Sequence, residues 1–362
     1  MRVAIVHYWL IKMRGGEKVL ENLCKIYPNA DIYTHVYNKN KISTIINSHA
    51  IKTTFIQYLP FSIKLYKLYL PLMPLALKLL NLKKYDLIIS SESGPSKGLV
   101  RSNNSVHVCY CHSPMRYLYD MKEEYLRNYN YFYKKVINLI FLFMKKWDFK
   151  SSRNIDLIIA NSNFVANRIK KYWKKDSEVI HPSINIDEFY IDNEKEDYYL
   201  VLSELNEYKR VDIAIDAFNK LNKPLYIIGD GPLINKFKNM SNTNITFLSN
   251  IDDRQKNIYL SKSKALVFPG IEDFGIVPLE SMASGTPVIA YKKGGVLDYL
   301  KDGLNGIFFN EQSSKSLINS IKKFEKEKNT FDPNEIRKSI LNFTFDNFSF
   351  NFNNAIKKYG IN

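Results

Sequence analysis

Residues 269–290, PGIEDFGIVPLESMASGTPVIA, decide the fold of this chain. Apolar runs at 265–268 and 287–290 bracket the stretch, and each is expected to form a buried strand. Glu272 and Glu280 stand eight residues apart between these two runs. The carboxylates therefore flank a strand-to-helix turn at the carboxyl edge of a parallel sheet, where open α/β folds bind ligands.

Glu272 is expected in the loop, and Glu280 just inside a helix that starts near Val277 and Pro278. A carboxylate at such an edge can accept hydrogen bonds from two neighbouring hydroxyls, as in the vicinal diols of sugars and ribose. Gly275 lets backbone N–H groups approach an anionic ligand at the helix N-terminus. Taken alone, either glutamate is equally compatible with a solvated acid near the positive end of the helix dipole. The candidate binding residues of this turn are Phe274, Gly275, Ile276 and Val277.

The whole pattern resembles the E-x7-E signature of retaining family-4 glycosyltransferases of group 1, which have the GT-B fold. In that family the second glutamate binds the nucleotide ribose and the first contacts the donor sugar, which implies these roles for Glu280 and Glu272. Residues 110–120 resemble a narrower branch, the mannosyltransferases of O-antigen and surface-polysaccharide biosynthesis. Further blocks follow the family's order along nearly the whole chain: 14–20 (RGGEKVL), 110–120 (YCHSPMRYLYD), 161–169 (NSNFVANRI), 179–182 (VIHP), 208–212 (YKRVD) and 229–232 (GDGP).

The resemblance implies an α/β chain with two Rossmann-like, doubly wound parallel-sheet domains facing a cleft. A chain of 362 residues with 45% hydrophobic content also fits two domains with separate cores. We predict an acceptor-binding domain at 1–185, a nucleotide-sugar-binding domain at 186–345 and a C-terminal helix at 346–362 that crosses back. The predicted strands are 3–7, 87–90, 106–110 and 155–160 in the first domain, and 199–202, 224–228, 245–248, 265–268 and 287–290 in the second.

Lys209 and Arg210 follow a predicted strand at its carboxyl edge, where they can neutralise a diphosphate leaving group, although such a pair can also face solvent. The family usually has an arginine earlier in this block. Glu204 stands there, so one phosphate contact is lost unless this carboxylate turns away. No Asp-x-Asp occurs, the motif with which transferases of the other common fold hold a divalent cation. We therefore expect no metal and no other cofactor.

Five more residues are candidates by resemblance. Gly15 and Gly16 are expected to let the first domain approach the phosphates, unless they only form a tight turn. His112 precedes Ser113 and Pro114, and the residue before a loop proline is kept extended, which fixes the end of this strand. By resemblance His112 is expected to contact the donor sugar, and a structural histidine is the alternative. Arg116 is assigned to an acceptor phosphate or else to a surface salt bridge, and Gly231 to substrate binding. The expected catalytic residues are His112, Glu272 and Lys209.

Charge is unevenly distributed. The net charge is +16, and residues 1–185 hold 29 Lys+Arg against 12 Asp+Glu, which leaves 23 against 24 for the remainder. Two segments, 60–84 and 131–150, interleave apolar residues with lysines. We expect them to attach the protein to an anionic membrane surface, and the alternative is that their apolar stripes face the core.

The cysteines Cys24, Cys109 and Cys111 suggest no disulfide framework and no zinc site, so we expect buried reduced thiols. The N-terminal residues lead straight into a strand, so no secretory signal is expected. The apolar run at 136–144 is too short to span a bilayer, which needs about 20 residues. These features predict a cytoplasmic protein that is peripheral on the inner face of the cytoplasmic membrane.

The leading hypothesis is a retaining, metal-independent glycosyltransferase that moves mannose from GDP-mannose to a lipid-linked oligosaccharide. A UDP-sugar donor, with glucose or N-acetylglucosamine, is the alternative within enzymes. A basic nucleic-acid-binding module is a remote alternative, because the chain has no nucleic-acid motif. A dinucleotide oxidoreductase needs G-x-G-x-x-G after the first strand, and the chain has only Gly15 and Gly16 there.

Overall fold

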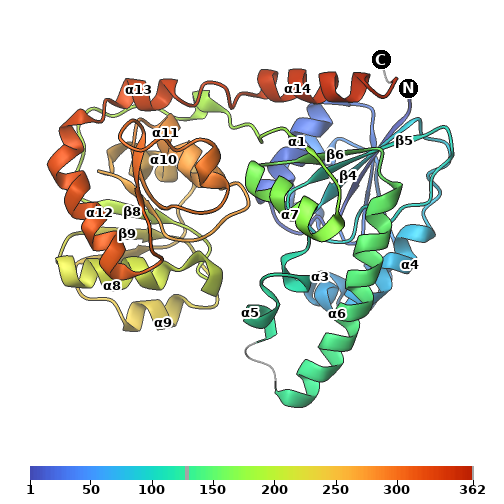
Figure 1. Ribbon diagram of the computed structural model, residues 1–362, viewed down its shortest axis with the longest axis horizontal. Helices are drawn as coiled ribbons and strands as arrows, with labels where there is room; N and C mark the ends of the chain where they lie inside the picture. The colour runs from blue at the N-terminus through green and yellow to red at the C-terminus, as the bar shows by residue number, and fades with distance from the viewer. Residues whose placement is uncertain (127–129, 361–362) are drawn as a thin grey trace. The chain divides into compact units, whose positions relative to one another are not determined.

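The computed structural model describes residues 1–126 and 130–360. The chain divides into two compact units (Figure 1). Unit 1 comprises Met1–Ser183 and Asp346–Asn362, and unit 2 comprises Ile184–Phe345. The boundaries expected from the sequence lay between 185 and 186 and between 345 and 346.

Unit 1 contains a seven-stranded sheet in the order β3-β2-β1-β4-β5-β6-β7, and every neighbouring pair is parallel. The predicted strands correspond to β1, β4, β5 and β6, which are almost entirely buried. The short strands β2, β3 and β7 were not predicted. Strands β3 and β7 lie at the sheet edges and are only partly buried, whereas β2 lies inside the sheet. The bounds are β1 Val3–His7, β2 Asp31–Thr34, β3 Ile51–Thr53, β4 Leu87–Glu92, β5 Val106–Cys111, β6 Leu157–Ala160 and β7 Glu178–Val179.

The helices of unit 1 begin where the sequence supplies a cap and a buried face. In α7, the Ser162 hydroxyl accepts the Val165 N–H at 3.1 Å, and Val165, Ile169 and Trp173 are buried. The C-terminal helix α14 packs Phe348 and Phe352 into the core of this unit. The helix bounds are α1 Gly15–Ile26, α2 Thr44–Asn47, α3 Ser62–Leu65, α4 Met73–Lys78, α5 Lys122–Leu126, α6 Tyr131–Ser151, α7 Asn163–Trp173 and α14 Phe345–Lys357.

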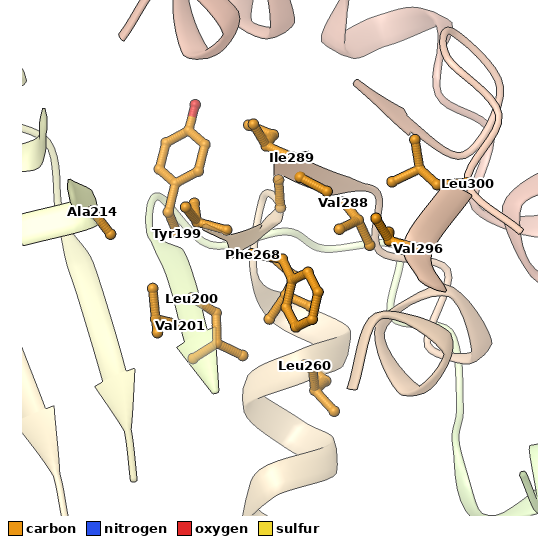
Figure 2. Packing of buried hydrophobic residues seen from close by; sticks show 14 of the residues in the cluster. Tyr199, Leu200, Val201, Ala214, Leu260, Phe268, Val288, Ile289, Val296 and Leu300 are labelled. Carbon is orange, nitrogen blue, oxygen red and sulfur yellow. The ribbon is translucent and has the colours of Figure 1, made fainter. Parts of the chain in front are cut away.

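Unit 2 contains a six-stranded parallel sheet in the order β10-β9-β8-β11-β12-β13. Figure 2 shows its apolar core, where Leu200 of β8, Phe268 of β11 and Ile289 of β12 belong to one cluster. Strand β13, which opens with a glycine, was not predicted. The strand bounds are β8 Tyr199–Leu202, β9 Leu225–Ile228, β10 Ile245–Leu248, β11 Leu266–Phe268, β12 Val288–Tyr291 and β13 Gly306–Phe309. The helix bounds are α8 Val211–Leu221, α9 Ile234–Asn239, α10 Asp253–Lys262, α11 Ile276–Ala283, α12 Ser314–Glu327 and α13 Pro333–Lys338.

Both sheets are doubly wound, as predicted. The strand order reverses between β1 and β4 in unit 1 and between β8 and β11 in unit 2. In open α/β sheets, ligands bind outside the carboxyl ends of the strands at such a switch point. The loops after β1, β4 and β5, and those after β8 and β11, are therefore the places to look for functional side chains.

The three cysteines are buried free thiols, which confirms that prediction. Burial raises the pKa of the Cys24 thiol to about 12, which keeps it protonated at neutral pH. Across residues 1–126 and 130–360, no helix combines the length and the apolar character needed to cross a membrane.

Candidate active site

At the switch point of unit 2, a lysine ammonium group lies beside a glutamate carboxylate. Lys209 ends the short 3₁₀ helix Glu207–Lys209, which follows β8, and Glu272 lies in the loop after β11. The Lys209 Nζ donates to Glu272 Oε1. Both side chains are less than one-fifth exposed. The pair therefore presents one positive and one negative group side by side, partly screened from water, at the edge where a ligand is expected.

Three glycines allow backbone segments to close around this pair. A Cβ on Gly270 would lie 3.0 Å from the Lys209 carbonyl oxygen. A Cβ on Gly294, which has a φ of +98°, would lie 2.7 Å from the Glu272 carbonyl oxygen. The Gly295 N–H donates to that same carbonyl at 2.9 Å. Side chains at these positions would push the Lys209 and Glu272 loops apart.

Helix α11 begins at Ile276, after Gly275 with a φ of +85°. The Tyr299 hydroxyl donates toward the Gly275 carbonyl at 2.6 Å and the Phe274 carbonyl at 3.0 Å, which fixes the turn. The Phe274 side chain is buried in the core of unit 2, so only its backbone is available to a ligand. Ile276 and Val277 form the first turn of α11, where backbone N–H groups lack partners within the helix.

Glu280 lies in the second turn of α11, and it contacts a lysine of the neighbouring helix α10. The Lys256 Nζ lies 3.4 Å from Glu280 Oε1 and 3.3 Å from Asp253 Oδ1. Burial opposes the charged form of Lys256, but these two carboxylates outweigh burial and raise its pKa. The ammonium group therefore stays charged and holds the Glu280 carboxylate in place.

The structure does not bring the other phosphate candidates of unit 2 into contact with the pair. The Arg210 guanidinium donates to Asp212 Oδ2 at 3.0 Å and to Gln312 Oε1 at 3.4 Å, so Asp212 is its ion-pair partner. Gly231 packs on the β8 loop, where an added Cβ would lie 2.4 Å from the Leu205 carbonyl oxygen. Its small size therefore has a packing reason in addition to the predicted binding role.

Glu204, which replaces the family's usual arginine, is exposed. Its carboxylate accepts from the Asn206 side-chain amide at 3.4 Å, and its backbone carbonyl accepts the Asn206 N–H at 3.0 Å. The residue therefore shapes the loop between β8 and Lys209.

In unit 1, His112 follows β5 and is only 8% exposed. Its Nε2 lies 2.8 Å from the Ser91 Oγ, and its backbone N–H donates to the Glu92 carbonyl at 2.8 Å. Gly16, in the first turn of α1, lies beside it: an added Cβ would meet the Tyr8 hydroxyl at 2.4 Å and His112 Nε2 at 3.7 Å. The structure therefore brings His112 together with the predicted glycine turn.

Gly15 begins helix α1 and is exposed. Arg116 begins the 3₁₀ helix Arg116–Leu118 after β5, and its guanidinium contacts the Met121 sulfur at 3.4 Å. Both remain predictions as ligand contacts.

Sequence reasoning missed the residues that support the predicted ones. They include Lys256, Tyr299 and Ser91, which lie far along the chain from the groups they contact. The glycine pair at Gly294 and Gly295, which follows β12 after two lysines, is a local sequence signal for a tight loop at the ligand edge.

Comparison with known proteins agrees with this architecture. Residues 183–340 match the family described as glycosyl transferases group 1, and residues 13–188 match glycosyltransferase family 4. The structure is similar to that of Anabaena Alr3699/HepE in complex with UDP, with a TM-score of 0.73 and 17% sequence identity over 99% of this chain and 100% of that one. At that identity the likeness supports the fold alone.

Two curated relatives are mannosyltransferases by name. The chain is 26% identical over 338 residues to alpha-1,3/1,6-mannosyltransferase ALG2 of Dictyostelium discoideum, covering 76% of each protein. It is 26% identical over 267 residues to O-antigen chain mannosyltransferase RfbU of Salmonella typhimurium, covering 69% of this chain and 72% of that one. The chain spans between about half and two thirds of the length of several further curated relatives.

The two family matches follow each other along the chain and together span residues 13–340. Each match falls mainly on one doubly wound parallel sheet. The chain therefore belongs to the group 1, family-4 glycosyltransferases and is an enzyme with the GT-B fold.

Proposed function

We propose that the protein transfers mannose from GDP-mannose to a lipid-linked glycan in surface-polysaccharide assembly, with retention of configuration and without a metal ion. The observation that carries this proposal is the Lys209–Glu272 pair at the switch point of unit 2. A sugar diphosphate has anionic oxygens and hydroxyl groups within a few bonds of each other. An ammonium group beside a carboxylate matches that arrangement, because the first binds phosphate and the second accepts from hydroxyls.

Glu280 is proposed to accept hydrogen bonds from the two ribose hydroxyls. Its carboxylate is held by Lys256 on one side and is less than one-fifth exposed. The first N–H groups of α11, at Ile276 and Val277, are proposed to face the phosphates, since a helix N-terminus favours negative charge. Together these residues bind the nucleotide half of the donor to unit 2.

The chemistry proposed for transfer is a front-side attack, in which the acceptor hydroxyl and the leaving phosphate meet on one face of the sugar. A phosphate oxygen takes the proton from the acceptor hydroxyl as the glycosidic bond forms. Lys209 stabilises the charge that develops on the leaving diphosphate. His112 is proposed to orient the sugar, and Arg116 to bind an acceptor phosphate, so the protein supplies position and electrostatics.

Mannose is favoured because curated relatives that span most of the chain are named mannosyltransferases. The second candidate is a UDP-sugar donor. Solved structures of similar fold contain UDP or UDP-glucose, which is the observation that favours it. The two candidates differ in the base that unit 2 must accept, so nucleotide binding separates them.

The donor is testable by thermal shift and by transfer assays on the full chain. We expect GDP to raise the melting temperature more than UDP or ADP, because a ligand that binds only the native state stabilises it. Glu280→Ala should weaken GDP binding roughly 10- to 100-fold, the range expected when a hydrogen-bonded charged group is removed. Transfer from GDP-mannose should proceed unchanged in EDTA.

Glu335→Ala is the matched control, because Glu335 is an exposed helix glutamate of the same unit. A larger rise in melting temperature with UDP than with GDP would identify a UDP-sugar as the donor in place of GDP-mannose. Loss of transfer in EDTA that Mg²⁺ restores would contradict the metal-free mechanism. A screen of nucleotide sugars with neither hydrolysis nor transfer, together with salt-sensitive oligonucleotide binding, would favour the nucleic-acid alternative.

We also propose that unit 1 attaches the enzyme to an anionic lipid surface on the cytoplasmic side of the cytoplasmic membrane. Each of the two basic segments, 60–84 and 131–150, has some side chains in the core and others on the surface. Tyr66, Leu70 and Met73 are buried, whereas a second set of large apolar side chains is exposed. The exposed set includes Phe61, Leu68, Leu75 and Leu79 in the first segment, and Tyr131, Phe132, Val136, Leu139, Leu142 and Phe143 on α6.

Exposed lysines accompany this apolar set: Lys64, Lys67 and Lys78 in the first segment and Lys135, Lys145 and Lys146 on α6. The N-terminal half of α6 projects from the rest of unit 1 (Figure 1), and no residue before Met144 on this helix is buried. Apolar side chains among lysines fit the boundary between anionic headgroups and acyl chains.

Vesicle flotation tests the lipid surface. The wild type is expected to float with vesicles of phosphatidylcholine and phosphatidylglycerol and much less with phosphatidylcholine alone. Reversing Lys64, Lys67, Lys145 and Lys146 to glutamate should weaken binding at least about tenfold, since each lysine contributes about 1 kcal/mol near such a surface. The control reverses four exposed lysines of unit 2: Lys236, Lys238, Lys315 and Lys322. Equal losses in both variants would show a general charge effect and no local surface.

A further inference from the structure

Four polar side chains form a buried line at the switch point of unit 1. The His112 Nε2 lies 2.8 Å from the Ser91 Oγ, and the same oxygen lies 2.9 Å from His7 Nδ1. The opposite nitrogen of that ring, His7 Nε2, lies 3.5 Å from Glu17 Oε1. The line therefore runs from Glu17 on α1, through β1 and β4, to the residue that follows β5.

Sheet register and burial make this line rigid. His7 pairs with Ser91 on the adjacent parallel strand, and both side chains are fully buried. Glu17 is 1% exposed, and its second oxygen accepts the Arg14 backbone N–H at 3.0 Å. Polar groups in such an interior are oriented by one another, because water does not compete for their hydrogen bonds.

The direction of hydrogen-bond donation along the line follows from which atoms can donate and which can accept. A carboxylate only accepts, so the Glu17 side chain favours a proton on the facing His7 Nε2. If His7 carries a single proton, that proton lies on Nε2, and the bare Nδ1 accepts from the Ser91 hydroxyl. That hydroxyl has one proton, so it must accept from His112 Nε2. Each group therefore donates toward Glu17.

We propose that Glu17, His7 and Ser91 are positioning residues that hold His112 as a neutral imidazole with its proton on Nε2. The Nδ1 of His112 is then a hydrogen-bond acceptor, suited to a sugar hydroxyl. The inference rests on the proposed function in assigning the sugar to His112. The hydrogen bond at one ring nitrogen of a histidine decides whether the other nitrogen carries a proton. Here the hydrogen bond at His112 Nε2 is oriented by Glu17, through Ser91 and His7.

The line makes Glu17→Gln an informative change. The Arg14 N–H still needs an acceptor, so the new amide places its oxygen there and turns its NH₂ toward His7 Nε2. That nitrogen must now accept, which moves the His7 proton to Nδ1. Ser91 then accepts from His7 and donates to His112 Nε2, so His112 carries its proton on Nδ1. The substitution thus reverses the His7–Ser91 and Ser91–His112 hydrogen bonds without removing a group.

The test is ¹⁵N NMR of the full chain labelled at its six histidines, with the His112 signals identified by their loss in His112→Gln. We expect His112 to be protonated on Nε2 in the wild type and on Nδ1 in Glu17→Gln. Glu21→Gln, a change on the same helix at a residue that pairs with Lys18, is the control and should leave His112 unchanged. The proposal is overturned if His112 is protonated on Nδ1 in the wild type, or if its proton stays on Nε2 in Glu17→Gln.

A kinetic arm compares two adjacent serines of β4. Ser91→Ala should lower kcat about tenfold with KM within about twofold, because the sugar still binds and is less well oriented. Ser90→Ala removes an equally buried hydroxyl, which lies 2.9 Å from His107 Nε2 on the other side of the strand. The two variants should have similar melting temperatures, and Ser90→Ala should keep its kcat. Equal kcat values for the two variants would assign Ser91 a structural role only.

The two arms separate this inference from the proposed function. A wild type that transfers no sugar from any nucleotide donor contradicts the proposed function, whereas the NMR arm still decides whether the line sets the His112 tautomer. An active wild type with an unchanged tautomer in Glu17→Gln contradicts the inference and leaves the proposed function in place.

Discussion

Lys209→Ala is expected to lower kcat/KM for sugar transfer about 10²- to 10³-fold, the loss seen when a group that stabilises transition-state charge is removed. In the wild type, the ammonium group lies beside Glu272 at the ligand edge of unit 2. Without it the leaving diphosphate loses the Lys209 ammonium group, and the Glu272 carboxylate that faced this lysine repels the diphosphate. Initial rates over a range of donor concentrations measure the loss.

Lys220→Ala is the matched control for that change. Lys220 lies in the last turn of α8, the helix that follows the Lys209 turn, and pairs with Asp216 at 58% side-chain exposure. It should retain wild-type rates, since exposed pairs contribute little. Full activity of Lys209→Ala with the nucleotide still bound would show that Lys209 is not part of the active site. Partial recovery in the double variant Lys209→Ala, Glu272→Gln would show that part of the loss comes from the carboxylate left behind.

Lys97→Met is expected to lower the free energy of unfolding by about 3–5 kcal/mol, the cost of breaking a buried ion pair from one side. The Lys97 side chain is fully buried, with its Nζ 2.9 Å from Glu92 Oε1 and in contact with Asp148 Oδ1. Methionine fills a similar volume but leaves two carboxylates facing each other without a cation. Denaturant unfolding of the full chain at neutral pH measures the change.

The pH dependence of this effect follows from the lysine pKa. Burial opposes charge on Lys97, but Asp148 and Glu92 outweigh it and raise the pKa well above its ordinary 10.5. A raised lysine pKa gives stabilisation that is complete below about 10.5 and is lost as pH rises through the folded-state value. The difference between wild type and Lys97→Met should therefore persist at neutral pH and narrow as the pH rises through the folded-state lysine pKa.

Two comparisons make the stability prediction sharp. Lys170→Met removes a 73%-exposed lysine of the same unit, paired with Asp176, and should cost less than about 1 kcal/mol. The triple variant Glu92→Gln, Lys97→Met, Asp148→Asn removes all the charges and should recover much of the loss. A stability of Lys97→Met equal to that of Lys170→Met would contradict the picture of an uncompensated buried charge.

This buried cluster also supports the site in unit 1. The Glu92 carbonyl accepts the His112 N–H, and the Glu92 side chain accepts from Ser96 and Lys97. Asp148 in turn accepts from Tyr119 and Trp173 at 2.6 and 2.7 Å. The end of β4 is thus held by charged groups from the loop after it and from α6, which keeps the His112 segment in a defined place.

The sequence by itself determined the fold class and the family. The central strands of both sheets contain short apolar runs, such as Leu87–Ile89 in β4 and Val288–Ala290 in β12, so their parallel, buried character could be predicted from composition and spacing. The E-x7-E spacing placed Glu272 in a loop and Glu280 in a helix, because both belong to one local strand-to-helix turn. Edge strands β3 and β7 escaped prediction because they are short and half-solvated.

Only the tertiary structure decided which side chains meet. Lys209 and Glu272 are 63 residues apart, Lys97 and Asp148 are 51 apart, and His7 and Ser91 are 84 apart. Their contacts depend on strand order and register, which bring distant segments to one edge of a sheet. Local patterns encode which residues face the core, whereas the partner of each polar group follows from how the strands pair across the whole unit.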